Sequence, residues 1–461
     1  KIFYHDIGDY LTREEKLKKI KGFGDISHPM MMWKELVPNE HGDWINHRNE
    51  IFSSFIPMIP SKKFDKKAES FFTTYSLGIA TARDAWVYNY GERDLFDNVK
   101  RTIDFYNSQR VGFRQQTGIK IEQFIDRNPQ KISWNDSLIS DCGSDKPLVF
   151  DDTLSRVGVY RAFTKEHIYY DKSLIQRPYQ TPKLFPTKEH KNLLICVSGI
   201  GGSKPFSTLI TDVIPNLHFT ENGQCFPLYW YDDSTSDIAD LFNQYSDENI
   251  LDKYDRQDGI TDWIYKICRK QYGNKVQKED IFYYVYGVLH NQEYVSIFNA
   301  DLKKTLPRLP LVDNPEDFWA FSKAGRELAE LHLNYETVEP YQGVECEENP
   351  VCGYGVEKMR FGKKDSKTHD KTTIIFNGGL TIKNIPLEAY DYVVNGKSAI
   401  EWVMERYQVT TDSKSGILND PNKWAEEHND EKYIFNLVLR MITVSLETMK
   451  IVNSLPKVKF E

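Results

Sequence analysis

The sequence predicts a mixed fold of the α+β class, in which short strands and amphipathic helices occupy different stretches of the chain. Short strand-like runs separated by turn residues gather at 147–240. Apolar residues recur at helical spacing over 94–109 and 315–333, and two further helices are expected at 396–408 and 431–453. Such a mixture in 461 residues predicts more than one domain.

The first stretch of the chain combines an expected strand with an expected helix. Residues 2–7 are typical of a strand. Thr12, followed three residues later by Glu15, forms the capping box that begins a helix over 12–21. Because the chain opens within a strand, and on Lys1, we expect it to start inside a larger protein.

Three domains are expected along the chain. A lysine-rich loop at 61–67 precedes the first boundary. The predicted domains are 1–75, 76–335 and 336–461, and the last is largely helical at its end. Strands of the second domain are expected at 157–163, 167–170, 192–198 and 226–231.

The composition indicates a globular protein with a substantial core, and its charge bears on possible partners. Lys and Arg number 59 against 67 Asp and Glu, which gives a formal net charge of −8. A small DNA-binding module is usually basic, so this total argues against nucleic acid. A large domain can nevertheless carry a basic groove on an acidic body. The 13% aromatic content fits either a large core or a surface on which bases stack.

Cysteine usage and hydropathy predict a cytoplasmic protein that does not enter a membrane. The six cysteines form no CxxC pair, and several lie in apolar runs, as reduced, buried thiols do. Apolar runs stay far shorter than a membrane span.

The search for catalytic motifs is negative. A glycine turn, Gly199–Gly202, follows the strand at 193–197, but it matches neither a P-loop nor GxGxxG, and Pro205 stands where a P-loop has Ser or Thr. We interpret it as a structural turn, or as a turn whose amides approach a DNA phosphate. The sequence contains no GxSxG, no HExxH and no Pro-Pro, the last being part of the catalytic loop of DNA amino-methyltransferases. We therefore expect no catalytic or cofactor-binding residue in this chain.

A metal site is not expected either. His41, His47 and Asp43 lie close together in the sequence, but this spacing in a loop carries no geometric information. They are interpreted as polar loop residues.

Segments that interleave Arg or Lys with aromatic residues are the remaining candidates for function. They are 81–89, 160–171, and 301–310 taken together with 318–325. Arg can pair bidentately with guanine, Asn can pair with adenine, and aromatic rings can stack on bases. Each segment taken alone is also compatible with a core strand that carries a salt-bridged surface.

Taken in order, short segments along the whole chain resemble the C-terminal part of type ISP restriction-modification enzymes. These segments are 4–11 (YHDIGDYL), 40–46 (EHGDWIN), 80–89 (ATARDAWVYN), 197–201 (VSGIG), 204–207 (KPFS), 224–227 (QCFP), 286–290 (YGVLH), 318–325 (FWAFSKAG) and 396–402 (GKSAIEW). Such enzymes join a nuclease, a helicase-like ATPase, an adenine methyltransferase and a target-recognition domain in one polypeptide.

The resemblance implies a layout. Residues 1–75 would be the end of the methyltransferase domain, with the last part of a Rossmann-like sheet, and the rest would be the specificity domain that reads double-stranded DNA. S-adenosylmethionine, ATP and magnesium would belong to upstream domains. The segment 160–171 (YRAFTKEHIYYD) is similar to a Tyr-Arg-Pro-Phe motif of related recognition regions, with Ala162 in place of the proline that fixes φ.

The DNA-contact hypothesis names eight residues. Arg83, Asn89, Arg161 and Lys165 are expected to contact DNA, with Trp86 and Phe163 as packing or stacking partners. Lys204 and Ser207, beside the glycine turn, complete the set.

Two other interpretations stay open. The chain could be a self-contained S-adenosylmethionine-dependent methyltransferase that uses the 199–202 turn, with Asp232 or Asp233 as the acidic partner of the ribose. It could also be an interaction domain without a role on DNA, which the acidic net charge favours.

Overall fold

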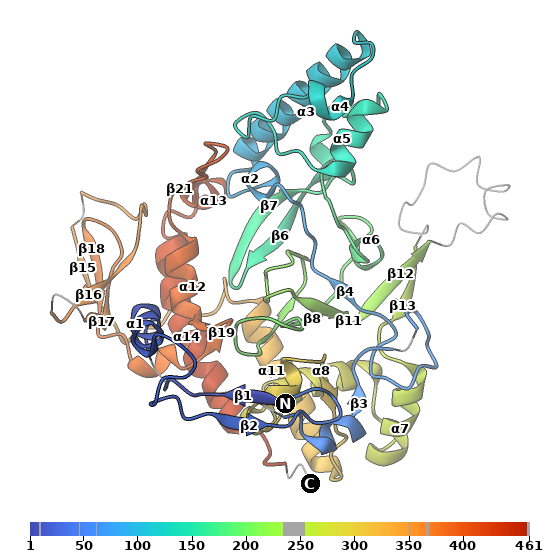
Figure 1. The fold of residues 1–461 in the computed structure, drawn as a ribbon, viewed down its shortest axis with the longest axis vertical. Coiled ribbons are helices and arrows are strands. Elements are labelled where there is room, and N and C mark those ends of the chain that lie inside the picture. The colour runs from blue at the N-terminus through green and yellow to red at the C-terminus, as the bar shows by residue number, and fades with distance from the viewer. Residues whose placement is uncertain are drawn as a thin grey trace. The chain divides into compact units, whose positions relative to one another are not determined.

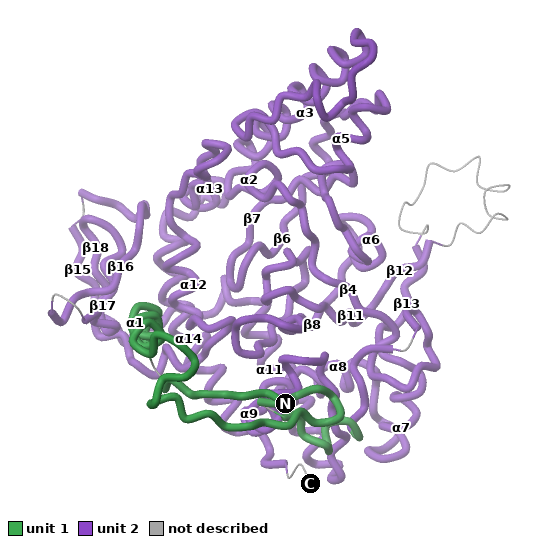
Figure 2. Tube along the Cα trace, viewed as in Figure 1, with its two compact units in different colours: residues 1–54 green, residues 55–461 purple. Residues whose placement is uncertain are grey.

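The computed structural model describes residues 1–8, 11–45, 47–60, 62–233, 254–349, 351–365 and 368–458. The chain divides into two compact units, unit 1 (1–54) and unit 2 (55–461), which Figure 2 colours separately. Residues 55–75 belong to unit 2, where the Phe71 and Thr73 amides donate to the carbonyls of Pro57 and Gly259.

The described part of unit 1 holds a small sheet, one α-helix and a 3-10 helix at Glu50–Ser54. Strand β1 (Ile2–Tyr4) pairs antiparallel with β2 (Lys34–Leu36), and α1 spans Arg13–Phe23. The expected capping box is confirmed, because the Thr12 amide donates to Glu15 Oε2 at 2.7 Å and the Glu15 amide donates to Thr12 Oγ1 at 3.3 Å. The resemblance implies the last part of a Rossmann-like sheet in residues 1–75, and this two-stranded antiparallel sheet gives no evidence for it.

The first sheet of unit 2 is built on a long hairpin. Its strand order is β10-β6-β7-β5, with β6 and β7 antiparallel and β10 parallel to β6. The four strands are β5 (Tyr88–Asn89), β6 (Ser155–Arg161), β7 (Thr164–Tyr169) and β10 (Ile214–Pro215). The two strands expected at 157–163 and 167–170 are thus confirmed, with the turn between them two to three residues earlier than expected.

The second sheet of unit 2 has the order β4-β11-β8-β9, and every neighbouring pair in it is antiparallel. Its strands are β4 (Ser76–Leu77), β8 (Leu194–Val197), β9 (Thr208–Thr211) and β11 (Gln224–Pro227). All of β8 is buried, as its unbroken apolar run predicts. The strand expected at 226–231 is divided between β11 and β12 (Tyr229–Asp233).

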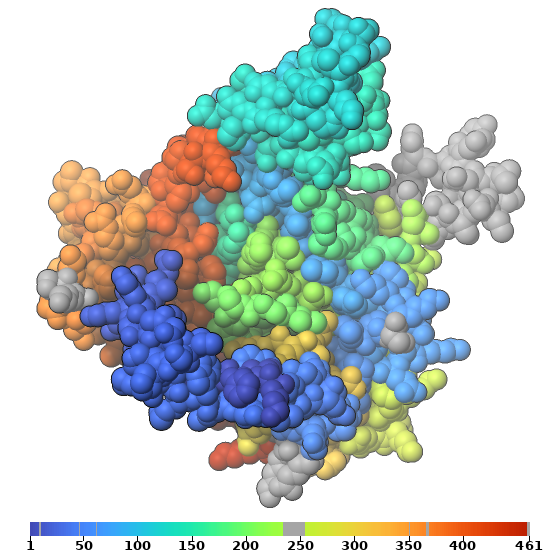
Figure 3. All heavy atoms as spheres, viewed as in Figure 1, coloured from blue at the N-terminus to red at the C-terminus, as the bar shows by residue number. Residues whose placement is uncertain are grey.

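A helical group follows the start of the first sheet. It consists of α3 (Glu92–Arg114), α4 (Ile121–Phe124) and α5 (Asp136–Gly143), drawn in teal at one edge of the face in Figure 3. The predicted apolar stripe of α3 is confirmed, since Leu95, Val99, Ile103 and Tyr106 are all buried.

A second helical group packs tightly around two glycines. Helix α8 (Lys278–Leu289) crosses α11 (Pro315–Leu333), the helix that the sequence predicts at 315–333. A Cβ on Gly325 would lie 1.9 Å from the Tyr283 carbonyl oxygen, and one on Gly287 would lie 2.3 Å from that of Phe321. Only glycine allows the two backbones to approach so closely.

The C-terminal part joins a sheet to two helices (Figure 1). The sheet has the order β15-β18-β17-β16, and the predicted helices are confirmed as α12 (Ala399–Arg406) and α14 (Tyr433–Asn453). Its strands are β15 (Glu345–Glu348), β16 (Arg360–Lys363), β17 (His369–Ile375) and β18 (Leu380–Lys383). Within the described ranges, no helix is both long enough and apolar enough to cross a membrane.

Short elements complete unit 2. The helices are α2 (Asp84–Val87), α6 (Thr181–Leu184), α7 (Asp262–Tyr272), α9 (Gln292–Ile297), α10 (Asn299–Leu302) and α13 (Asn422–Glu427). The strands are β3 (Ile56–Pro57), β13 (Tyr254–Asp258), β14 (Arg308–Leu309), β19 (Val393–Val394), β20 (Lys397–Ser398), β21 (Thr410–Thr411) and β22 (Leu418–Asn419).

Candidate nucleic-acid interface

The tip of the β6–β7 hairpin carries the motif that the sequence singles out. Arg161 ends β6, and Phe163 takes a φ of 54°, in the left-handed region that closes the tight turn. The Thr164 hydroxyl donates to the Ala162 carbonyl at 3.1 Å, and Ala162 itself is fully buried. Phe163 packs edge-on against Tyr335 and turns inward. The turn therefore forms without proline and leaves Arg161 at the edge of the fold.

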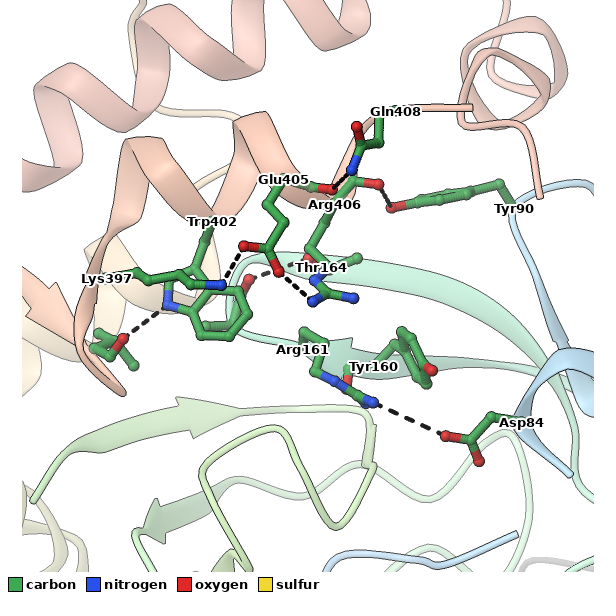
Figure 4. A network of polar contacts seen from close by, with 12 residues as sticks. Asp84, Tyr90, Tyr160, Arg161, Thr164, Lys397, Trp402, Glu405, Arg406 and Gln408 are labelled. Atoms are coloured by element: carbon green, nitrogen blue, oxygen red, sulfur yellow. Dashed lines mark hydrogen bonds and ion pairs between the residues drawn. The ribbon is translucent and has the colours of Figure 1, made fainter. Parts of the chain in front are cut away.

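Four contacts with three residues hold Arg161 in one orientation, and Figure 4 shows two of these residues, Tyr160 and Asp84. Its Nη1 donates to the Tyr160 carbonyl at 2.6 Å and to Asn216 Oδ1 at 3.0 Å. Its guanidinium lies 3.8 Å from the centre of the Tyr160 ring, and Nη2 lies 4.0 Å from Asp84 Oδ2. The side chain remains 16% exposed. Such anchoring fixes the plane of the guanidinium in advance, which lowers the entropy cost of a bidentate contact to a ligand.

The end of α12 places a second basic group near Arg161. Glu405 bridges Lys397 and Arg406, and partial burial, which acts to raise its pKa, is outweighed by these cationic partners, so the pKa of Glu405 is lowered. Tyr90 donates its hydroxyl to the Arg406 carbonyl at 3.1 Å. Figure 4 shows these side chains together with Arg161, above the hairpin.

A polar pocket of about 350 Å³ lies between the hairpin and α12. Its lining includes Asp84, Tyr160, Glu166 and Arg406. Glu166 is only 2% exposed and accepts a hydrogen bond from Asn419 Nδ2 at 3.1 Å. Burial raises the pKa of Glu166 to about 7, so this carboxyl titrates near neutrality.

The glycine turn forms a second exposed feature. The Gly199 amide donates to the Glu221 carbonyl at 2.7 Å, and the Gly201 amide donates to the Lys303 carbonyl at 3.1 Å. The Lys204 amide donates to Glu221 Oε2 at 2.8 Å, while the Lys204 side chain is exposed. Segment 199–222, in light green, reaches the surface of the face shown in Figure 3.

The hairpin β19–β20 connects the two features. The Asn395 amide donates to Ser207 Oγ at 2.8 Å, and Asn395 Nδ2 donates to the Phe219 carbonyl at 3.2 Å. Two residues later, Lys397 joins the Glu405 and Arg406 group. The exposed lysine of the turn and the basic group of α12 thus rest on one hairpin.

Five of the eight residues expected at the interface are buried. Arg83 donates Nε to the Ser133 carbonyl at 3.2 Å and Nη1 to that of Leu174 at 2.5 Å. Asn89 Nδ2 donates to the Leu418 carbonyl at 3.0 Å. The other three buried residues are Trp86, Phe163 and Ser207. Their functional atoms face the protein interior in this arrangement.

Lys165 lies at the wall of a larger groove of about 730 Å³. Its ammonium pairs with Glu336 at 2.6 Å, and the two side chains are 17% and 18% exposed. Among the eight predicted residues, Lys204 presents an exposed charged side chain, whereas the Arg161 and Lys165 side chains are 16% and 17% exposed and contact other residues of the protein.

Three residues of the site escaped the sequence analysis. Lys397 lies in the segment 396–402, which supported the family resemblance but received no role, and Arg406 and Glu221 stand alone in the sequence. Glu221 contacts residues 17 and 18 positions away, and Lys397 contacts Glu405 eight positions away, which no helix or strand spacing predicts. Arg406 contacts the adjacent Glu405 and, through its carbonyl, the distant Tyr90.

The geometry around the glycine turn differs from that of a dinucleotide or S-adenosylmethionine site. A Rossmann site requires β8 to have parallel neighbours, yet β9 and β11 both run antiparallel to it. Asp232 and Asp233 lie on β12, which pairs with β13 in a separate two-stranded sheet. Among the residues that the structure describes, no three His, Cys, Asp or Glu side chains gather as a metal site would require.

The comparisons with known proteins agree on one family. The family described as the Type ISP C-terminal specificity domain matches residues 70–437. A nuclease-deletion mutant of the Type ISP restriction-modification enzyme LlaGI, in complex with a DNA substrate mimic, is 35% identical with a TM-score of 0.83, over 100% of this chain and 39% of that one. No curated protein matched the sequence.

Two further DNA complexes are similar. The ATP-dependent Type ISP enzyme LlaBIII bound to DNA is 35% identical with a TM-score of 0.84, over 100% of this chain and 28% of that one. The DrdV–DNA complex is 28% identical with a TM-score of 0.82, over 100% of this chain and 43% of that one. The chain therefore spans less than half the length of each of these three matched chains.

Proposed function

We propose, because this chain belongs to the family of Type ISP C-terminal specificity domains, that it binds double-stranded DNA and reads a specific sequence for a larger restriction-modification enzyme. The observation that carries the proposal is the likeness over the full chain to enzymes solved on DNA. The acidic net charge is compatible with this function, because a basic surface need only be local.

The second part of the proposal concerns the residues that touch DNA. We assign a base or phosphate contact to Arg161, which is fixed on Tyr160 and Asn216 and whose side chain is 16% exposed. Lys204 is assigned a phosphate contact, since its side chain is exposed beside the turn. The buried residues Arg83, Trp86, Asn89, Phe163 and Ser207, and the paired Lys165, are assigned the role of holding these contacts in place.

The remaining part of the proposal concerns the enzyme around this chain. Residues 1–75 would close a Rossmann-like adenine methyltransferase domain, and a helicase-like motor and a nuclease would carry ATP-dependent cleavage. S-adenosylmethionine, ATP and magnesium would then bind outside this chain. The whole assembly would act in the cytoplasm, where the DNA it reads is found.

The central claim is tested by selecting, from a pool of random DNA duplexes, those that bind to the chain. A specificity domain should enrich one sequence, and fluorescence anisotropy should then show at least about a thousandfold preference for the enriched duplex over unrelated duplexes. If no sequence is enriched and the chain binds duplexes no better than background, DNA recognition is contradicted and an interaction domain is favoured.

Alanine variants then test the two contacts separately. Arg161→Ala should weaken binding to the selected duplex and relax the preference at one position, at a cost of about 1–3 kcal/mol. Lys204→Ala should weaken binding to selected and unrelated duplexes alike. It should also lower the salt slope, which is the dependence of log affinity on log salt concentration, by about 1. Lys450→Ala, at a side chain that is 76% exposed on α14, is the matched control and should change neither.

A further inference from the structure

The glycine turn at 199–204 contains a carboxylate supplied by the protein itself. Glu221 Oε2 accepts from the Lys204 amide at 2.8 Å, and Oε1 accepts from the Ser203 hydroxyl at 2.9 Å. Partial burial acts to raise the pKa of Glu221, but the hydrogen bonds from Lys204 and Ser203 outweigh it and lower the pKa. The carboxylate is therefore ionised at neutral pH and bound as an anion within the turn.

Glycines let the turn approach Glu221 and the residue after it closely. A Cβ on Gly202 would lie 2.6 Å from Glu221 Oε2, and one on Gly199 would lie 2.1 Å from the Asn222 carbonyl oxygen. Gly201 has a φ of +75°, in the region that favours glycine. The turn is thus shaped around Glu221.

This arrangement changes how the turn can meet DNA. Successive backbone amides in such a turn form a concavity that binds anions. Here the Lys204 amide, and with it the Ser203 hydroxyl, is already occupied by Glu221. A DNA phosphate would have to displace a carboxylate that is held by two hydrogen bonds, so the interior of the turn is not free for it.

The exposed side of the turn is available instead. Ile200 is 52% exposed, and the Ser203 and Lys204 side chains are exposed beside it. The Gly201 amide donates to the Lys303 carbonyl, which brings the exposed Lys303 to the same place. Within the described part of the chain, neither lysine side chain pairs with a carboxylate, so both charges are available to a partner.

We propose that Glu221 is a positioning residue for DNA binding, which acts by holding the backbone of the 199–204 turn so that the side chain of Lys204 meets a DNA phosphate. The inference rests on the proposed function and deepens it. It states that Glu221, a negatively charged residue next to the DNA, raises the affinity for DNA although its own charge repels the DNA phosphates.

The sign of the effect on affinity makes this inference testable. Glu221→Ala and Glu221→Gln remove the same negative charge, but glutamine retains an oxygen that can accept from the Lys204 amide. If only charge mattered, both variants would bind DNA more tightly and to the same extent. If Glu221 positions Lys204, alanine should bind roughly fivefold to tenfold more weakly than wild type, and glutamine should recover most of the loss.

The Lys204→Ala background separates positioning from general damage to the fold. There the phosphate contact is already absent, so adding Glu221→Ala should no longer weaken binding and should slightly strengthen it by removing charge. Glu431→Ala removes an equal charge from an exposed position and serves as the charge control. Binding is measured by fluorescence anisotropy on the selected duplex across a salt series, with a thermal melt of each variant.

The outcomes are distinct. The proposal is supported if Glu221→Ala lowers both the affinity for DNA and the salt slope, and if Glu221→Gln restores the affinity. It also requires that Glu221→Ala no longer weakens DNA binding in the Lys204→Ala background. Equal tightening by alanine and glutamine overturns it, as does a loss that persists unchanged in the Lys204→Ala background. If the wild-type chain binds no duplex, the proposed function itself is contradicted.

Discussion

Lys165 and Glu336 form an ion pair with 2.6 Å between Nζ and Oε2, and both side chains are less than one-fifth exposed. Tyr433 donates its hydroxyl to the other carboxylate oxygen. The pair therefore joins β7 to α14 through Glu336, in the segment just after α11. Although the sequence suggests Lys165 as a DNA contact, its charge is committed to this internal connection.

Lys165→Ala is expected to lower the free energy of unfolding by about 2–4 kcal/mol, because it leaves the partly buried Glu336 carboxylate without its cation. Urea denaturation measures this loss. Lys450→Ala breaks an exposed pair with Glu447 and should cost less than about 1 kcal/mol. If Lys165→Ala keeps full stability but lowers the salt slope of DNA binding, Lys165 contacts a phosphate.

Arg83 is expected to support the fold around the interface. Its guanidinium is buried between the carbonyls of Ser133 and Leu174, and burial lowers the pKa of Arg83 to about 10. Arg83→Ala should destabilise the chain by about 2–4 kcal/mol, since two buried carbonyls lose their donor. Arg83→Lys should recover little, because one ammonium cannot reproduce the forked geometry.

DNA binding discriminates the two roles of Arg83. At a temperature where the variant is still folded, the salt slope of Arg83→Ala should match that of wild type, because no phosphate contact is lost. A normal melting temperature combined with a reduced slope would mean that the guanidinium leaves its pocket to contact DNA.

The chain is also expected not to bind S-adenosylmethionine tightly on its own. The amides at the glycine turn are satisfied by Glu221 and Lys303, and β8 has antiparallel neighbours on both sides. Isothermal titration should give no saturable heat at micromolar concentrations of the cofactor. Stoichiometric binding of S-adenosylmethionine that is abolished by Gly202→Ala would support the methyltransferase interpretation.

Local signals in the sequence predicted the helices well. The helix expected at 315–333 is observed over Pro315–Leu333, because its apolar repeat is long and Asn314 caps it with a side-chain hydrogen bond. The helix expected at 396–408 begins later, at Ala399, since Lys397 and Ser398 form β20 instead. In the structure the helix start is fixed by a capping box between Ser398 and Glu401.

The site was harder to predict, for a physical reason. Arg161 was correctly placed on the strand expected at 157–163, but the turn that ends this strand is made by Phe163 at positive φ, a residue type that gives no turn signal. Arg83 and Asn89 belong to residue types that are mostly exposed, yet they are buried because carbonyls distant in the sequence accept from them. Such long-range partners leave no trace in local spacing.

Glu166 should make the stability of the chain depend on pH near neutrality. Burial raises its pKa from the ordinary value of 4.5 to about 7, against the opposing effects of the Asn419 hydrogen bond and of Arg161 and Arg406, while the negative charge of Asp84 adds to the rise. The folded state therefore holds this proton more tightly than the unfolded chain does. Its contribution to stability is fully present below about pH 4.5 and is lost as the pH rises through about 7.

Glu166→Gln removes this titration while keeping the size of the side chain. The variant should be close to wild type at about pH 5 and more stable than wild type by up to about 3 kcal/mol at about pH 8, where the wild-type carboxylate is charged and buried. Guanidinium denaturation at several pH values between these limits gives the difference directly, with Glu431→Gln as the exposed control. A difference that stays constant with pH would mean that Glu166 is already ionised in the folded protein, and the pocket beside Arg161 would then carry a full negative charge when it meets DNA.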